Sequence, residues 1–228
     1  MKPDLTKIVC ATRGRKEEFR RTPLGQSLGL YPWPNVEVRL FSENKRGLPA
    51  VYNEAIAECR GISCNLVFVH DDVYLCDFFW PKRIRIGLKQ FDVLGLAGNK
   101  RRVPKQPSWA FPNLDFKWDS PKYLSGVVGH GDGFPPNELS FYGEPGQEVR
   151  LLDGLMLAAN SNVLHSTNLR FDEKFDFHFY DLDFCREAES KELRMGTWPI
   201  SVVHRSGGNF ESKNWRIGYQ KYLAKWGD

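Results

Sequence analysis

The stretch NLVFVHDDVYL, from Asn65 to Leu75, leads four apolar residues directly into a histidine and two adjacent aspartates. Neighbouring carboxylates repel each other, so Asp71 and Asp72 need a cation nearby, or one of them must face water. A strand that is apolar on both faces ends at the sheet edge where α/β proteins bind ligands. The stretch therefore indicates either a cation beside these carboxylates or a solvated turn at the end of the strand.

Three further polar clusters lie at the ends or edges of apolar segments. Thr12 and Arg13 follow the run KIVCA, and His204 ends the run ISVVH. Asp181 and Asp183 open an apolar-periodic stretch. Each cluster also has an ordinary structural explanation: Asp181 suits a helix N-cap, Asp183 complements the dipole of a first helical turn, and a strand-end histidine is usually just hydrogen-bonded.

Strands and helices alternate along the first part of the chain and would position these clusters. The pattern predicts strands at 7–11, 35–43, 65–69 and 92–98, and helices at 16–28 (interrupted near Pro23), 48–61 and 82–91. This alternation predicts a Rossmann-like α/β fold, with a mixed, mostly parallel central sheet flanked by helices.

From about residue 99 to 147 the periodicity disappears among prolines, aromatics and the GHGDG stretch. We expect an irregular insert there, either a surface excursion packed by its own aromatics or a substrate lid or acceptor groove. Beyond it, residues 148–164 are strand-like around the Asp153–Gly154 pair, a helix follows Asp181, and 198–204 predict another strand. A terminal helix spaces four aromatics for packing: Trp215, Tyr219, Tyr222 and Trp226.

The bulk properties describe a globular chain of 228 residues, expected to form one domain. Its net charge of +4 is too small to predict nucleic-acid binding, although a basic run at 100–105 leaves contact with an anionic acceptor or a peripheral membrane surface open. Five scattered cysteines without a CxxC pair predict free thiols in a reducing compartment. With no signal-like or membrane-spanning apolar run, we expect a cytoplasmic location and no transmembrane segment.

Taken in chain order, six stretches resemble one known family: CATRGR, GLPAVYNEAI, VFVHDDV, LLDGLMLAANSNVL, FDEKFDFHFYDLDFCREA and VVHRSGG. They are similar to GT-A-fold nucleotide-sugar glycosyltransferases, in the family 2-like branch whose acidic motif reads His-x-Asp. The resemblance covers nearly the whole chain and is weakest at 99–147. It implies a single GT-A-like domain over 1–228, with a nucleotide-binding half at 1–98 and an acceptor and catalytic half at 99–228.

The same resemblance implies transfer of a sugar from a nucleotide diphosphate donor, with UDP expected, to an acceptor hydroxyl. The anomeric carbon would be inverted in a single displacement. Asp72 and His204 would hold a divalent metal, Mn2+ or Mg2+, which neutralises the leaving diphosphate. Asp181 would be the general base, although the family's Glu-Asp pair reads Tyr180–Asp181 here.

Other residues fall where the family contacts its donor. Thr12, Arg13 and Asn53 would lie on the nucleotide side, His70 or Asp71 would face the ribose or the metal's surroundings, and Arg205 would contact the diphosphate. Asp153 would floor the donor-sugar and acceptor site, and a plain turn is the alternative. These expected donor contacts are Thr12, Arg13, Asn53, His70, Asp71, Asp153 and Arg205.

Two rival functions remain open at the level of sequence. A nucleotidyltransferase would share the Rossmann-like start and the acidic metal site. It would be expected to carry a glycine-rich phosphate loop with a lysine after the first strand, whereas CATRGRKEEF has a single glycine. The second rival is a catalytically degenerate domain that binds nucleotides or partners. The acceptor, the donor sugar and the oligomeric state are not encoded in any motif.

Overall fold

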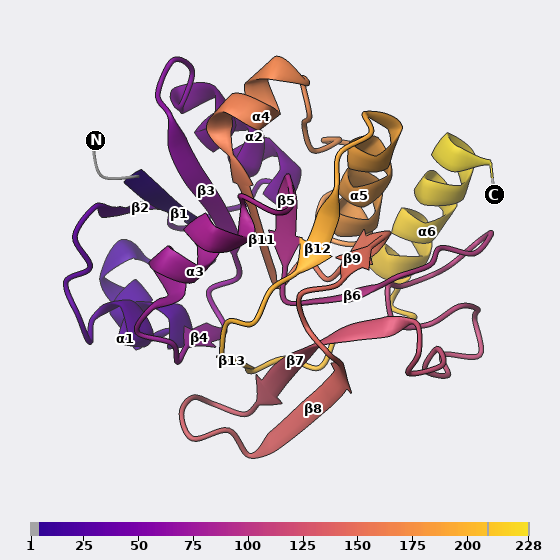
Figure 1. The fold of residues 1–228 in the computed structure, drawn as a ribbon, viewed down its shortest axis with the longest axis horizontal. Coiled ribbons are helices and arrows are strands. Elements are labelled where there is room, and N and C mark those ends of the chain that lie inside the picture. The colour runs from indigo at the N-terminus through magenta and orange to yellow at the C-terminus, as the bar shows by residue number, and fades with distance from the viewer. Residues whose placement is uncertain (1–4, 209, 228) are drawn as a thin grey trace.

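The computed structural model describes residues 5–208 and 210–227, and Figure 1 shows two sheets with helices packed around the larger one. The central sheet has seven strands in the order β2-β1-β3-β11-β5-β12-β9. Their bounds are β2 (Val36–Phe41), β1 (Leu5–Ala11), β3 (Cys64–Val69), β11 (Met156–Asn160), β5 (Val93–Gly95), β12 (Met195–Thr197) and β9 (Glu148–Val149).

Most central strands run in one direction. The pairs β1–β2, β1–β3 and β5–β12 are parallel, whereas β11 is antiparallel to both β3 and β5, and β9 is antiparallel to β12. Only β11 and β9 of these described strands therefore oppose the rest. The predicted mixed, mostly parallel α/β sheet is confirmed.

A second sheet lies below the first in Figure 1. Its order is β10-β6-β7-β13-β4, and β8 pairs with β7. The bounds are β10 (Leu151–Leu152), β6 (Ala97–Asn99), β7 (Leu124–His130), β13 (Val202–His204), β4 (Val73–Leu75) and β8 (Glu138–Gly143). Because β4 belongs to residues 1–98 and β13 to residues 99–228, this sheet joins the two halves.

The prediction of an irregular insert at 99–147 is wrong for β7 and β8, which form an antiparallel pair. Glycines hide this strand pattern in the sequence. Gly126 has φ of +117°, and a Cβ there would collide with the carbonyl oxygen of Leu96, so the close approach of the chain between β5 and β6 requires glycine. Residues 100–123 contain no helix or strand.

The helices are η1 (Lys16–Arg21), α1 (Pro23–Leu28), α2 (Leu48–Glu58), α3 (Trp80–Gly87), α4 (Ser161–Ser166), α5 (Tyr180–Ser190) and α6 (Lys213–Trp226). The predicted interruption at Pro23 is confirmed, because Thr22 caps α1 by accepting a hydrogen bond from Gly25 N. The strand predicted to continue to 164 stops at Asn160, whose side chain caps α4. The strand β12 was not predicted. The strand predicted at 198–204 is shorter than expected, because only β13 is regular there.

Buried aromatics hold α5 and α6 against the sheet. The predicted packing of the terminal stripe is confirmed for Trp215, Tyr219 and Tyr222, whose rings contact Phe179. Asp183 is fully buried. It accepts a hydrogen bond from Trp226 and pairs with Lys225 at 2.8 Å, which fits a structural anchor.

The five cysteines are free thiols, as predicted. No helix in the described part of the chain combines the length and apolarity needed to cross a bilayer.

Candidate functional site

His70, Asp72 and His204 form one cluster, in which a ligand atom of each side chain lies within 4.8 Å of the others. His70 and Asp72 follow directly after β3, whose residues are all buried. His204 reaches them because β13 pairs with β4 so that His204 lies opposite Val73. The backbone N–H of Arg205 then donates to the carbonyl of Asp72 at 3.1 Å. Strand register therefore brings together residues more than 130 positions apart.

Asp72 carries its charge in a place where water does not reach one of its oxygens. Its Oδ1 is buried, has no hydrogen-bond partner among the described residues, and lies 3.4 Å from Nε2 of His204. Burial alone would raise the pKa of Asp72, but the His204 imidazole outweighs it and holds that pKa at about 2. Burial would likewise lower the pKa of His204, and Asp72 raises it. An ionised carboxylate with an unsatisfied buried oxygen beside two imidazoles fits a divalent cation.

The tautomer of His70 follows from its neighbour Tyr180. The Tyr180 hydroxyl donates its single proton to the carbonyl of Gly154 at 2.7 Å and also lies 2.9 Å from Nε2 of His70. It must therefore accept at the second contact, which assigns the ring proton to Nε2. Burial lowers the pKa of His70, so the ring is neutral and Nδ1 keeps its lone pair. A neutral imidazole oriented by a polar neighbour is the form in which histidine binds metals.

Asp181 is the most perturbed carboxyl group near this cluster. It lies in the first turn of α5, where Phe179 is the N-cap, so the alternative role of Asp181 as N-cap is wrong. Its Oδ2 accepts from Gly154 N at 3.0 Å and its Oδ1 from Leu182 N at 2.9 Å. Burial, followed by the negative charge of Asp153, raises the pKa of Asp181 to about 7. A carboxyl group with that pKa can exchange a proton near neutral pH.

The charge of Asp153 acts on both Asp181 and the His70–Asp72–His204 cluster. Asp153 raises the pKa of Asp181 and of His204, and it offsets the effect of burial on the pKa of His70. Its Oδ1 accepts from Leu155 N at 2.9 Å and closes a turn, as the alternative prediction of a turn at Asp153 stated. Its Oδ2 faces elsewhere and accepts from the Trp109 indole at 2.7 Å. Position 154 requires glycine, because any side chain there would collide with the Tyr180 hydroxyl.

Two residues near the site were missed by sequence reasoning. Trp109 binds Asp153 from the segment predicted to be irregular. His130 lies opposite His204 in the β7–β13 pairing, and burial together with the charge of His204 lowers its pKa. Its Nε2 lies 3.0 Å from Ser140 Oγ. The GHGDG motif was the available signal for His130, and no local signal marked Trp109.

The predicted nucleotide-side residues Thr12 and Arg13 follow β1 as expected. Thr12 is buried and shapes this turn: its Oγ1 accepts from Gly14 N, and its carbonyl accepts from Asn44 N. Arg13 is exposed, and within the described ranges its guanidinium has no hydrogen-bond or ion-pair partner. Beside this turn a surface hollow of about 470 Å3 is lined by residues 41–46.

The remaining predicted contacts have other partners. Asn53 holds the segment before α5, exchanging two hydrogen bonds with the backbone of Phe171 and donating a third to Glu173, so the structure does not bring its amide to the cluster. Asp71 is half-buried and outside the cluster. Arg205 is exposed and pairs with Asp132 at 2.9 Å.

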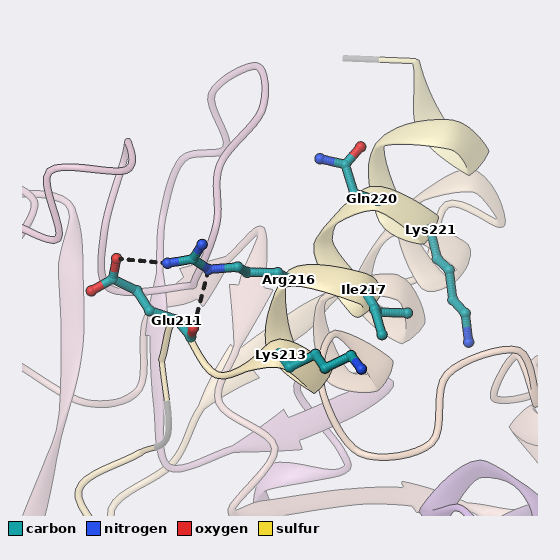
Figure 2. A pocket seen from close by; sticks show the side chains of 6 residues that line it. All are labelled: Glu211, Lys213, Arg216, Ile217, Gln220 and Lys221. Carbon is teal, nitrogen blue, oxygen red and sulfur yellow. Dashed lines mark hydrogen bonds and ion pairs between the residues drawn. The ribbon is translucent and has the colours of Figure 1, made fainter.

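A larger hollow, of about 580 Å3, lies on the outer face of α6 and contains none of the predicted site residues. Figure 2 shows Arg216 reaching across it to Glu211, whose backbone oxygen accepts from Arg216 Nε at 3.1 Å. The chemistry of the cluster, and not the size of a hollow, therefore identifies the site.

Comparison with known families and structures bears on the family and the fold of the chain. Residues 35–222 match a glycosyltransferase-like family. None of the curated proteins matches the chain.

Among solved structures, S. aureus TarS is 14% identical, with a TM-score of 0.51 over 96% of this chain and 40% of that one. TarS 1-349 in complex with UDP-GlcNAc is 15% identical, with a TM-score of 0.51 over 91% of this chain and 61% of that one. GalNAc-T7 with UDP, GalNAc and Mn2+ is 10% identical, with a TM-score of 0.55 over 100% of this chain and 49% of that one. The chain spans less than two thirds of the length of each, and the shared feature is the GT-A fold.

Proposed function

The chain belongs to the glycosyltransferase-like family, and from this premise we propose that it transfers a sugar from a nucleotide diphosphate donor, UDP in the first instance, to an acceptor hydroxyl. One observation carries the proposal. Asp153 lies within electrostatic reach of both the His70–Asp72–His204 cluster and Asp181. Such a site can hold a leaving diphosphate at one end and a proton acceptor at the other.

His70, Asp72 and His204 would hold the divalent metal. The donor set of two imidazoles and one carboxylate favours Mn2+ over Mg2+, which prefers all-oxygen surroundings. When bound, the metal supplies positive charge to the diphosphate as the sugar–oxygen bond breaks.

Asp181 would be the general base in a single displacement. The acceptor oxygen forms a bond to the anomeric carbon, the bond from that carbon to the diphosphate breaks, and the acceptor proton passes to the Asp181 carboxylate. The two backbone N–H groups that bind Asp181, from Gly154 and Leu182, fix its orientation. This displacement inverts the anomeric carbon, as the family 2-like motif order implies.

The nucleotide would lie along the turn after β1, in the 1–98 half. The hollow lined by residues 41–46 supports this placement, because its backbone is bound to the Thr12 turn. Arg13 offers an exposed cation to the phosphates. Arg205, in the sequence RSGG, would contact the diphosphate only after its ion pair with Asp132 breaks.

The acceptor would meet the 99–228 half. Trp109 supports this, because its indole binds Asp153 and its ring contacts Trp118 and Tyr142, which are only partly buried. An aromatic wall beside the base suits a ring-bearing or saccharide acceptor.

Calorimetry with UDP, with and without Mn2+, tests the binding half of the proposal. We expect UDP affinity that depends on Mn2+, and UDP binding that is the same in all metal conditions would contradict it. Release of UDP from a panel of UDP-sugars tests the catalytic half. Asp181→Asn should keep UDP affinity and slow UDP release by about 10²–10⁴-fold. Pyrophosphate release from a nucleoside triphosphate and a sugar phosphate would instead favour a nucleotidyltransferase.

A further inference from the structure

The loop that follows β4 is hydrogen-bonded to the loop that precedes β2, and Asp72 lies at the other end of β4. Trp33, in the loop before β2, donates its indole N–H to the carbonyl of Phe78 at 2.9 Å. The Trp33 ring also lies between Tyr31, at a centroid distance of 5.4 Å, and buried Trp80, at 5.9 Å. The 29–34 loop and the 77–79 loop therefore form one surface anchored by Trp80, the first residue of α3.

This surface exposes large apolar side chains that the fold does not use. Phe78 and Phe79 are 61% and 65% exposed, and Leu30 and Tyr31 are 60% and 49% exposed. We call these four residues the loop patch. Ile86 of α3 adds a side chain that is 40% exposed. Four adjacent large apolar residues at loop tips indicate an interaction site, since isolated exposed apolar residues are common but clusters are not.

The helix beside the loop patch is basic on its exposed face. The buried face of α3 is Trp80, Ile84 and Gly87. Its other face, with the residues just after it, carries four exposed cations: Lys82, Arg83, Arg85 and Lys89. Asp77, an acidic residue just before α3, forms an ion pair with Arg83.

We propose that the loop patch and the basic face of α3 dock the protein on an anionic lipid surface. The aromatic tips would enter the headgroup boundary, where Tyr and Phe rings are stable, and the α3 cations would meet lipid phosphates and carboxylates. Charge complementarity favours this occupant over a second copy of the chain, because two copies meeting through this face would bring the α3 cations against each other. Phe78 and Phe79 of the loop patch are separated from Asp72 along the chain by one short strand, β4, and the residues just after it.

Co-sedimentation with vesicles tests the proposal. We expect the wild-type chain to bind vesicles of phosphatidylcholine with about one third phosphatidylserine, and to bind pure phosphatidylcholine vesicles about tenfold more weakly or less. The double variant Phe78→Ser/Phe79→Ser should lose about tenfold or more of its partitioning. Lys82→Glu/Lys89→Glu should lose the preference for phosphatidylserine.

The matched control is Leu139→Ser/Phe141→Ser, because these two side chains are 64% and 62% exposed on β8, which β7 and β13 separate from β4. This variant should bind vesicles like the wild type. Wild-type protein that stays in the supernatant would overturn the proposal, and so would equal losses of vesicle binding in Phe78→Ser/Phe79→Ser and in the control variant. So would light scattering in which Phe78→Ser/Phe79→Ser converts a vesicle-free dimer to a monomer. Mn2+-dependent UDP binding, measured alongside, reports on the proposed function independently.

Discussion

Trp109 donates an indole hydrogen bond of 2.7 Å to the carboxylate of Asp153, joining the least regular segment of the chain to the centre of the site. Trp109 is 7% exposed, so this bond is largely shielded from water. Because Asp153 in turn sets the charge environment of Asp181 and His204, the bond couples the insert to both ends of the proposed reaction.

Trp109→Phe should therefore reduce activity and stability together. It keeps most of the ring packing and removes the donor to a charged group, a loss of about 1.5–3 kcal/mol in the free energy of unfolding. We expect UDP release to slow about tenfold, measured under saturating donor. Trp80→Phe is the control, since that ring is fully buried and its indole N–H has no hydrogen-bond partner within the described residues. Equal effects of the two substitutions would contradict a special role for the Asp153 contact.

The pKa of Asp181 predicts a pH-dependent rate. A general base must be ionised, so with a pKa of about 7 the rate should rise roughly tenfold per pH unit below neutrality and level off above it. A pH profile of UDP release between about pH 5 and 9 measures this. A profile that is flat through neutrality would remove Asp181 as the base.

The same group predicts the direction of a stability change. Its pKa is raised from 3.8 in the folded state, so between about pH 4 and 7 the folded chain binds more protons at this group than the unfolded chain does. The contribution of Asp181 to folding stability should therefore fall as pH rises through this window. The difference in unfolding midpoint between the wild type and Asp181→Asn, followed from pH 4 to 8, isolates that contribution.

The sequence was sufficient to predict those parts of the site that end apolar strands. Asp72 and His204 each follow a buried run, and strand register then determines that they meet. That they hold a metal stays a prediction. Local patterns cannot reveal contacts created by packing, such as the bond between Tyr180 and His70 or the bond between Trp109 and Asp153.

The β7–β8 hairpin was missed for a different reason. Its glycines are required by the close approach of neighbouring backbone, and glycine removes the alternating side chains by which a strand is recognised. Asn53 has a structural role that the sequence did not reveal. Its place in a helix that resembles the family pattern suggested a nucleotide contact, but its amide fastens the segment before α5.

The proposed metal site predicts unequal roles for the two adjacent aspartates. Asp72 belongs to the cluster and has a buried oxygen without a hydrogen-bond partner, whereas Asp71 lies outside the cluster. Mn2+ at about a hundred times its dissociation constant should stabilise the wild type by about 2.7 kcal/mol. Asp72→Asn should abolish this gain and Asp71→Asn should keep most of it. Thermal unfolding with and without Mn2+, after treatment with a chelator, gives the comparison; a reversed order would assign the metal to Asp71.

Tyr180 stands where the resemblance implies the first carboxylate of a Glu-Asp pair, and its hydroxyl lies 2.9 Å from Nε2 of His70. It accepts from His70 Nε2 while donating to the carbonyl of Gly154. In Tyr180→Phe both bonds are lost, the proton on His70 is free to move to Nδ1, and the ring is free to rotate. We expect about tenfold weaker Mn2+ binding, which is the size of effect seen when the polar partner of a metal-bound histidine is removed. We also expect the free energy of unfolding to fall by about 1–2 kcal/mol. Tyr219→Phe controls for loss of a buried hydroxyl, because its bond is to the Lys105 carbonyl. Calorimetry with Mn2+ alone distinguishes the two variants, and a Tyr180→Phe protein with wild-type Mn2+ affinity would show that His70 does not depend on this contact.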